Sequence, residues 1–252
     1  MSRRRNKITA TLVPFLFLTL ICVAAIAPAA LVDTFDAPLP AATAQADGSG
    51  PAPAVQSGGP TGDFLRLVYD GQNSQNNQYA YDQTDAGLFS TIVTQFDFRA
   101  FSAAANQAAD GFSFALIPTA DWGTSGAGPG YTAEEPNIPG MFGLGFDLHP
   151  ADGATPVNDV SIHFNNVEVH NVKRDPASEI DLDNNQFHRA QLTLQQVGNS
   201  TNATLILSPD VYGAPGSPVT AITSWPTPVA ASCSVRTWPW PRKPARRRPS
   251  PN

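Results

Sequence analysis

The chain has 252 residues and a formal net charge of −6, but its charges are distributed unevenly. Ten of the 15 basic residues lie in the first seven or the last 17 positions. The stretch between them keeps five basic residues against all 21 acidic ones, which is a formal charge of −16. A surface with this charge repels nucleic acid and anionic membranes, so neither is expected as a partner, whereas cations and neutral polymers such as glycans are compatible with it.

The first 29 residues have the pattern of an export signal. Basic residues up to Lys7 are followed by an apolar run over residues 8–27 and then by small residues, Ala27-Pro28-Ala29, which predict cleavage after Ala29. The mature protein is therefore expected to be secreted. The apolar run is also long enough to span a bilayer, so the alternative is an uncleaved membrane anchor.

From residue 31 to about residue 224, short apolar segments are separated by clusters of Gly, Pro, Asn and Asp, without helical periodicity over three turns. This pattern predicts an all-β fold. The chain has two cysteines, and Cys22 leaves with the signal, so the mature protein has no internal disulfide and depends on its core for stability. Residues 37–61, rich in Ala, Pro and Gly, are expected to form a long surface loop.

Strands are predicted over residues 64–69, 90–101, 111–118, 141–149, 160–164, 167–169, 188–196 and 203–207. Segment 111–118 is apolar on both faces, as in a central strand. In segment 141–149 the apolar side chains share one face, and Gly143, Gly145 and Asp147 lie on the other, where the glycines leave room for a neighbour or a ligand. The apolar parity changes after Asn165-Asn166, which predicts a turn or bulge there, and residues 198–202 are expected to connect a hairpin.

The end of the chain has a different composition. Residues 236–252 contain six basic residues, five prolines, two tryptophans and no acid. Proline at alternate positions removes hydrogen-bond donors that a strand needs, so residues 232–252 are expected to form a basic disordered tail and the sandwich domain to end at residue 231 without its final strands. A further hypothesis is that this tail is out-of-frame translation of a GC-rich gene, since GC-rich codons give Arg, Pro and Ala in a wrong frame.

Four segments, in order, resemble the signature strands of the legume-type (L-type) lectins. They read A-D-G-F-S-F-A-L-I-P at residues 109–118, G-M-F-G-L-G-F-D at 140–147, N-D-V-S-I-H-F-N at 158–165 and F-H-R-A-Q-L at 187–192. The resemblance covers roughly residues 64–207. It implies a concanavalin A-like jelly-roll β-sandwich of antiparallel strands over residues 30–231, and carbohydrate binding.

The resemblance also implies a sugar site. Asp110 matches the aspartate that accepts hydrogen bonds from two sugar hydroxyls, and Gly111 follows it in the same motif. Gly140 or a neighbour matches the position that offers a backbone N–H to the sugar. Asn158 completes the residues assigned to carbohydrate binding by this resemblance.

A calcium site is implied in the same way. Asp147 matches the carboxylate that holds calcium, a hard cation that prefers oxygen ligands, and Asp152 and Asp159 are the candidates to join it. Gly145 stands where legume members carry Glu, and Asp159 falls near the position of their metal-binding His. The transition-metal site is therefore expected to be lost.

The stretch E-I-D-L-D at residues 179–183 allows a different function. Glu179, Asp181 and Asp183 would share one face of a strand, which is the layout of a glycoside hydrolase, and laminarinase-like glucanases of the same fold carry E-I-D-x-E. Here the last position is the shorter Asp183, the flanking residues are polar, and the stretch is expected to be a solvated acidic loop away from Asp110 and Asp147. A secreted non-catalytic glycan-binding protein is the first hypothesis, a glucanase-like hydrolase the second, and a structural or adhesion module without sugar affinity the third.

Overall fold

The computed structural model describes residues 31–72, 74–83, 89–101, 110–129, 136, 138–148, 158–173, 181–225 and 235–239. The elements formed by these residues are β1 (Ala42–Gln45), β2 (Ala54–Gln56), β3 (Phe64–Arg66), β4 (Gln78–Tyr81), β5 (Thr91–Phe98), β6 (Gly111–Leu116), α1 (Thr119–Trp122), β7 (Phe142–Asp147), β8 (Asp159–Phe164), β9 (Val167–Lys173), β10 (His188–Val197), β11 (Ser200–Ser208), β12 (Val219–Trp225) and β13 (Val235–Pro239). The described part of the chain has no helix long and apolar enough to cross a bilayer.

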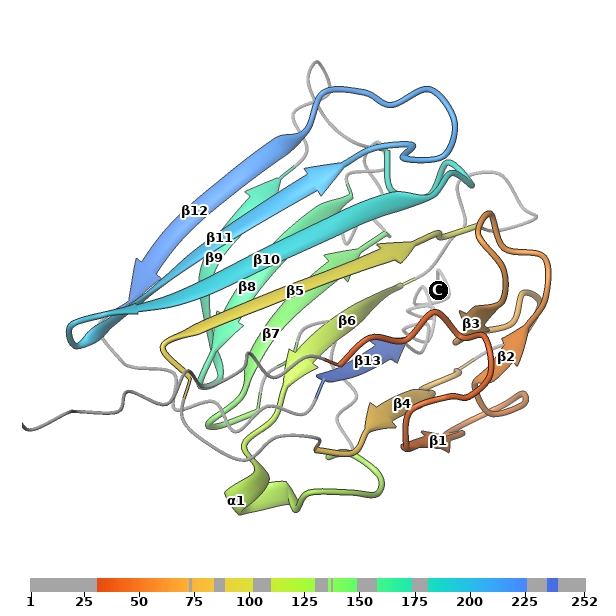
Figure 1. Ribbon diagram of the computed structural model, residues 1–252, viewed down its shortest axis with the longest axis horizontal. Coiled ribbons are helices and arrows are strands. Elements are labelled where there is room, and N and C mark those ends of the chain that lie inside the picture. Colours follow the sequence, from red (N-terminus) through yellow and green to blue (C-terminus); the bar gives the residue numbers. More distant parts are fainter. Residues whose placement is uncertain are drawn as a thin grey trace, which may run out of the picture. The chain divides into compact units, whose positions relative to one another are not determined.

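The strands form three antiparallel sheets. The largest has the order β1-β4-β13-β6-β7-β8-β9, the second has the order β12-β11-β10-β5, and β2 pairs with β3 in a small third sheet. All strand pairs are antiparallel. In Figure 1 the run β6-β7-β8-β9 and the run β12-β11-β10-β5 can be followed as two layers of the same unit. The prediction of an all-β antiparallel sandwich is confirmed.

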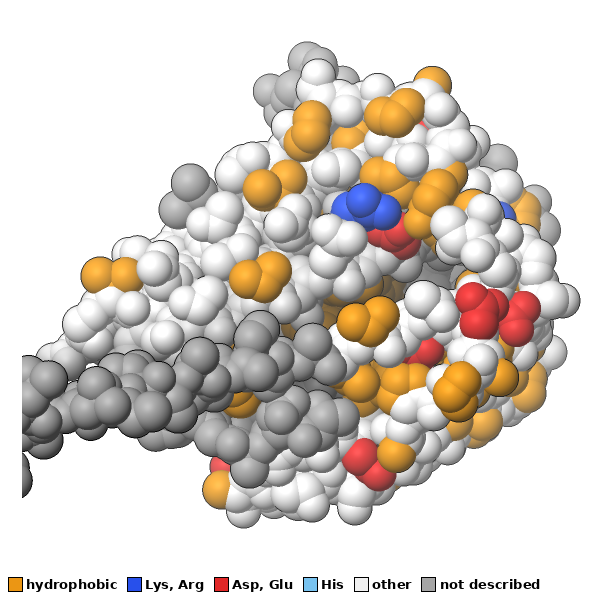
Figure 2. Space-filling model, viewed as in Figure 1, with side chains coloured by type: hydrophobic (Ala, Val, Ile, Leu, Met, Phe, Trp, Pro, Cys, Tyr) orange, Lys and Arg blue, Asp and Glu red, His pale blue; other side chains and the backbone are white. Residues whose placement is uncertain are grey.

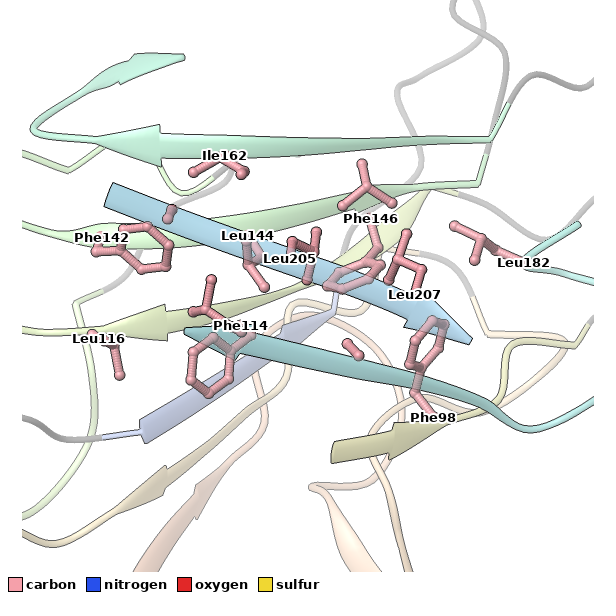
Figure 3. Close-up of a cluster of buried hydrophobic side chains, with 14 of the residues drawn as sticks. Phe98, Phe114, Leu116, Phe142, Leu144, Phe146, Ile162, Leu182, Leu205 and Leu207 are labelled. Atoms are coloured by element: carbon pink, nitrogen blue, oxygen red, sulfur yellow. The ribbon is translucent and has the colours of Figure 1, made fainter. Parts of the chain in front are cut away.

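The hydrophobic core lies between the two larger sheets. Its buried side chains come from β6, β7 and β8 on one side and from β5, β10 and β11 on the other (Figure 3). Aromatic rings join the layers: the ring centroid of Phe96 lies 5.3 Å from that of Phe114, and the centroid of Phe98 lies 5.0 Å from that of Phe146. Such contacts add to the burial energy of the rings, and they fix how the two sheets face each other.

The predicted turn at Asn165-Asn166 is confirmed. Both residues have positive φ, 51° and 65°, which is the geometry of the tight hairpin turn that connects β8 to β9. The hairpin of β10 and β11 was expected to have a five-residue loop over residues 198–202. In the structure Ser200 already pairs with Val197, so the connection is only Gly198-Asn199.

Several elements were not predicted. Strands β1 and β2 lie within residues 37–61, which were expected to be loop, and β4 is fully buried although its sequence is polar and aromatic. The sheet is also more complete than expected, because β12 pairs with β11, and β13 lies between β4 and β6. The expected tail is therefore wrong for residues 235–239. The strand ends at Pro239, where the proline-rich sequence begins, so proline removes no donor from its interior.

The surface charge agrees with the composition. Figure 2 shows one face, on which acidic side chains are more frequent than basic ones and the hydrophobic side chains are scattered among polar ones. Single exposed apolar residues of this kind are ordinary on a folded protein.

Candidate functional site

Strand register brings most of the predicted site residues to one end of the seven-stranded sheet. Gly111 of β6 pairs with Asp147 of β7, and Asp147 pairs with Asp159 of β8. Asp110 and Asn158 come directly before β6 and β8, so they lie at the same end. We call these five residues the aspartate end of the sheet.

Backbone packing fixes Asp110 and Gly111. A Cβ atom on Gly111 would lie 2.0 Å from the backbone oxygen of Phe146, so no larger residue fits between β6 and β7 here. The backbone oxygen of Asp110 accepts a hydrogen bond of 2.8 Å from the N–H of Leu148, and only 6 % of Asp110 is exposed. Asp110 and Gly111 thus form a closely packed start of a strand, and the peptide that precedes Asp110 lies outside the described residues.

Gly140, which the resemblance assigns to carbohydrate binding, does not lie at this end of the sheet. Gly140 precedes β7, and the first residue of β7, Phe142, pairs with Leu116 at the far end of β6. Leu116 is six residues from Asp110, and Gly140 lies beyond the pair of Leu116 with Phe142, so at about 3.4 Å per residue Gly140 is more than about 20 Å from Asp110 along the sheet. The N–H of Gly140 already donates a 2.9 Å hydrogen bond to Oδ1 of Asn165.

Asp147 and Asp159 share the face of the sheet that is turned away from the core. Their neighbours in sequence, Phe146 and Val160, are buried in the core cluster, and side chains alternate along a strand. Two facing carboxylates are suitable ligands for a calcium ion. The described residues contain no group of three or more His, Cys, Asp or Glu side chains arranged to hold a metal, and Asp152, the third predicted ligand, lies outside them. Asp147 and Asp159 therefore fit calcium, but other ligands are needed.

The predicted acidic loop is neither solvated nor remote from the aspartate end. Leu182 is only 2 % exposed and belongs to the core cluster (Figure 3), so Asp181 and Asp183 on either side of it are held at the edge of the core. Nδ2 of Asn158 donates a hydrogen bond of 3.4 Å to Oδ1 of Asp181. The expectation of a solvated loop away from Asp110 and Asp147 is wrong here, and Glu179 lies outside the described residues. In the sequence, the single apolar residue Leu182 between two acids is the signal from which this burial could have been predicted.

The carboxyl groups of Asp181 and Asp183 interact with each other. Burial, the hydrogen bond to Asp181 and the negative charge of Asp181 together raise the pKa of Asp183 to about 6, against smaller opposing effects of a backbone hydrogen bond and of Asn158. Two carboxylates in contact cannot both ionise at their ordinary pKa, because like charges repel. The pair therefore favours either a shared proton or a cation.

His188 anchors the same loop from the first residue of β10. Its Nδ1 lies 3.4 Å from the backbone nitrogen of Asp210, which can only donate, so Nδ1 accepts. Nε2 then carries the proton and donates to Oδ1 of Asn184 at 3.1 Å. Burial lowers the pKa of His188, consistent with this neutral form. The histidine is a structural link between the loop and β10.

No family model matches the sequence, and no curated protein matches it. Solved structures do match. Peanut lectin with a nine-residue peptide is 14 % identical, with a TM-score of 0.52, over 82 % of this chain and 85 % of that chain. Lectin II from Ulex europaeus is 15 % identical, with a TM-score of 0.46, over 78 % of this chain and 81 % of that chain. The match to peanut lectin carries the fold assignment: the chain has the jelly-roll sandwich of the legume lectins, as the signature segments predicted.

Proposed function

We propose that this protein is a non-catalytic carbohydrate-binding protein that recognises glycans through the aspartate end of the seven-stranded sheet. The observation that carries the proposal is the meeting of Asp110, Gly111, Asp147, Asn158 and Asp159 at one end of a legume-lectin fold. These are the residues that the A-D-G, F-D and N-D segments supply. A fold alone does not define function, so the proposal rests on this site.

The chemistry of the aspartate end suits neutral sugars. A carboxylate has up to four acceptor positions, and adjacent sugar hydroxyls present donors at a spacing that one carboxylate can accept. The Leu148 hydrogen bond fixes the backbone of Asp110, which reduces the conformational entropy lost when a ligand binds. The acidic middle of the chain repels anionic polymers, which favours neutral glycans over charged ones.

Calcium is part of this proposal. Asp147 and Asp159 would hold the ion on the outer face of the sheet, with Asp152 as a third ligand. The ion would neutralise the two facing carboxylates and stabilise the neighbouring strand ends. No transition metal is expected, since Gly145 offers no ligand where a carboxylate is needed.

A non-catalytic role is supported by the geometry of the other acids. The two carboxyl groups of a glycoside hydrolase flank the scissile bond at about 5–5.5 Å or about 6.5–9.5 Å, depending on the stereochemistry of the reaction. Asp181 and Asp183 instead hydrogen-bond to each other, and Asp181 also accepts from Asn158. This contact leaves no room for a scissile bond between these two acids, and Glu179, the third acid of the motif, lies outside the described residues. The apolar N-terminal segment supports export, so the glycans would lie outside the cell.

Glycan-array binding by the mature chain tests the proposal. Wild type is expected to bind a restricted set of neutral glycans, and Asp110→Asn is expected to lose that binding while keeping its fold. Asp70→Asn is the matched control, because Asp70 is exposed and lies in the connection between β3 and β4. Equal binding by the Asp110 and Asp70 variants would place the sugar site elsewhere, and release of reducing sugar from β-glucans would indicate a hydrolase.

A further inference from the structure

We propose that Asn199 is a site of N-linked glycosylation when the chain is exported through a secretory pathway. The sequence contains two Asn-X-Ser/Thr triplets in which X is not proline, Asn199-Ser200-Thr201 and Asn202-Ala203-Thr204. Both lie in the β10–β11 hairpin, and the structure distinguishes between them. The modification depends on the export predicted from residues 1–29 and is independent of glycan binding at the aspartate end.

Asn199 lies at the tip of this hairpin. Val197 pairs with Ser200, so Gly198 and Asn199 are the two residues of the turn. Gly198 has a positive φ of 60°, which glycine adopts readily in two-residue turns. Asn199 is exposed, and a Cβ atom added to Gly198 would meet no heavy atom within 4 Å, so the turn is surrounded by open space.

The tip of the hairpin extends beyond the strands on either side of it. The pairing of β10 with β5 ends at Gln195, and the pairing of β11 with β12 begins at Thr201. Residues 197–200 therefore project from the sheet formed by the described strands, as can be followed in Figure 1. A glycan is bulky, and on this tip it can extend into solvent without displacing a strand.

Asn202 lies inside the sheet. It pairs with Gln195 of β10 and with Ser224 of β12, so a strand flanks it on each side. Asn202 is only partly exposed. A glycan on Asn202 would have to lie across the side chains of both neighbouring strands, which are close to it on the same face. Asn202 is therefore expected to remain unmodified in the folded chain.

The expected reaction transfers an oligosaccharide from a lipid-linked pyrophosphate donor. Nδ2 of Asn199 forms an N-glycosidic bond to C1 of the first sugar and loses a proton, while the bond from C1 to the pyrophosphate breaks and the lipid pyrophosphate leaves. The triplet also requires the hydroxyl of Thr201. Thr201 is only 1 % exposed in the folded protein, so an enzyme reaches this hydroxyl only before β11 pairs, and transfer is expected during export.

The glycan would lie far from the aspartate end. His188, the first residue of β10, pairs with Phe98, and the ring centroid of Phe98 lies 5.0 Å from that of Phe112, which follows Gly111. The aspartate end is therefore close to the start of β10. Asn199 follows the end of this ten-residue strand, which spans about 30 Å. Binding at the aspartate end is expected to be the same with and without the modification.

Expression of the full chain, with its own export signal, in cultured eukaryotic cells tests the proposal. A peptide N-glycosidase is expected to remove one glycan from wild type and to convert Asn199 into Asp, which peptide mass spectrometry locates. Asn199→Gln is expected to lack the glycan, whereas Asn202→Gln, the matched control, is expected to keep it. Wild type without a glycan that the enzyme removes, or a glycan that persists in Asn199→Gln, overturns the proposal.

A second pair of variants covers the case that Asn199→Gln fails to fold. Thr201→Ser keeps the hydroxyl and is expected to keep the glycan, whereas Thr201→Val keeps the shape of the side chain and is expected to lose the glycan. Both are measured on the total chain in cells and medium, because transfer precedes folding. A glycan on Asn199 in Thr201→Val overturns the proposal, because the triplet then does not direct the transfer.

Discussion

Adding one methyl group at Gly111 is expected to lower the stability of the protein clearly. Its Cβ would collide with the backbone oxygen of Phe146 at 2.0 Å, so β6 and β7 have to separate to admit it. Gly111→Ala is expected to lower the free energy of unfolding by about 2–4 kcal/mol, measured by urea denaturation. Gly71→Ala is the control, because Gly71 also has a positive φ of 75° but has open space around it. It should cost only about 1 kcal/mol, and equal losses would contradict the packing at Gly111.

Protonation of the buried His163 is expected to make the stability of the protein depend on pH. Burial lowers its pKa to about 4 from an ordinary value near 6.5, although Glu168 acts in the opposite direction. Between these values the unfolded chain binds the proton and the folded chain does not, so stability falls as the pH decreases from about 6.5 to about 4. His163→Asn is expected to show a smaller loss of stability over this interval in urea denaturation at several pH values. An unchanged pH profile would show that His163 does not carry the effect.

Individual site residues were predictable where they adjoin a strand with a clear apolar pattern. Asp110, Asp147 and Asp159 were predicted as site residues, and the register brings Asp147 and Asp159 opposite each other. The position of Gly140 at the other end of β6 could not be predicted, because only the antiparallel pairing decides which end of that strand it reaches. The contact between Asn158 and Asp181 joins residues 23 positions apart, and no local pattern specifies such a pairing.

Among the elements, the β8–β9 hairpin makes a specific prediction about turn chemistry. Asn165 and Asn166 both have positive φ, and the second position of such a turn favours glycine. Asn166→Gly is expected to raise stability by about 0.5 kcal/mol, whereas Asn166→Ala is expected to lower it by about 1 kcal/mol. Urea denaturation of both variants measures the difference. Asn165 is left intact because it accepts the Gly140 hydrogen bond, and equal stability of the two variants would contradict the turn.

Strands with strict alternation were predictable, and those without it were missed. In β7 the residues Phe142, Leu144 and Phe146 face the core in the predicted parity. By contrast, β4 has the sequence Q-Y-A-Y and is buried along its length. Because its polar residues are not typical of a buried strand, the strand was not predicted from the sequence. Strand β13 was missed because arginine and proline dominate its surroundings, and its pairing with β4 and β6 depends on residues more than 100 positions away.

For the whole molecule, the position of β13 decides whether the end of the chain is dispensable. This strand lies between β4 and β6 and provides the link between β1-β4 and the rest of the seven-stranded sheet. Truncation after Ala231 removes it and is expected to lower the melting temperature by at least about 5 °C. Truncation after Trp240 keeps β13 and should leave the melting temperature unchanged. Thermal unfolding of both truncated chains measures the difference. Equal melting temperatures would instead support a disordered tail over residues 232–252, as the composition predicted.

Isothermal titration of the strongest array ligand measures most directly whether the aspartate end binds a neutral glycan. Asp110→Asn keeps the shape of the side chain and removes a charged acceptor, and hydrogen bonds to charged groups contribute about 1.5–3 kcal/mol each. We therefore expect wild type to bind and Asp110→Asn to bind at least about tenfold more weakly. Equal affinity in the two proteins, or no binding of any glycan by wild type, would contradict glycan binding at the aspartate end.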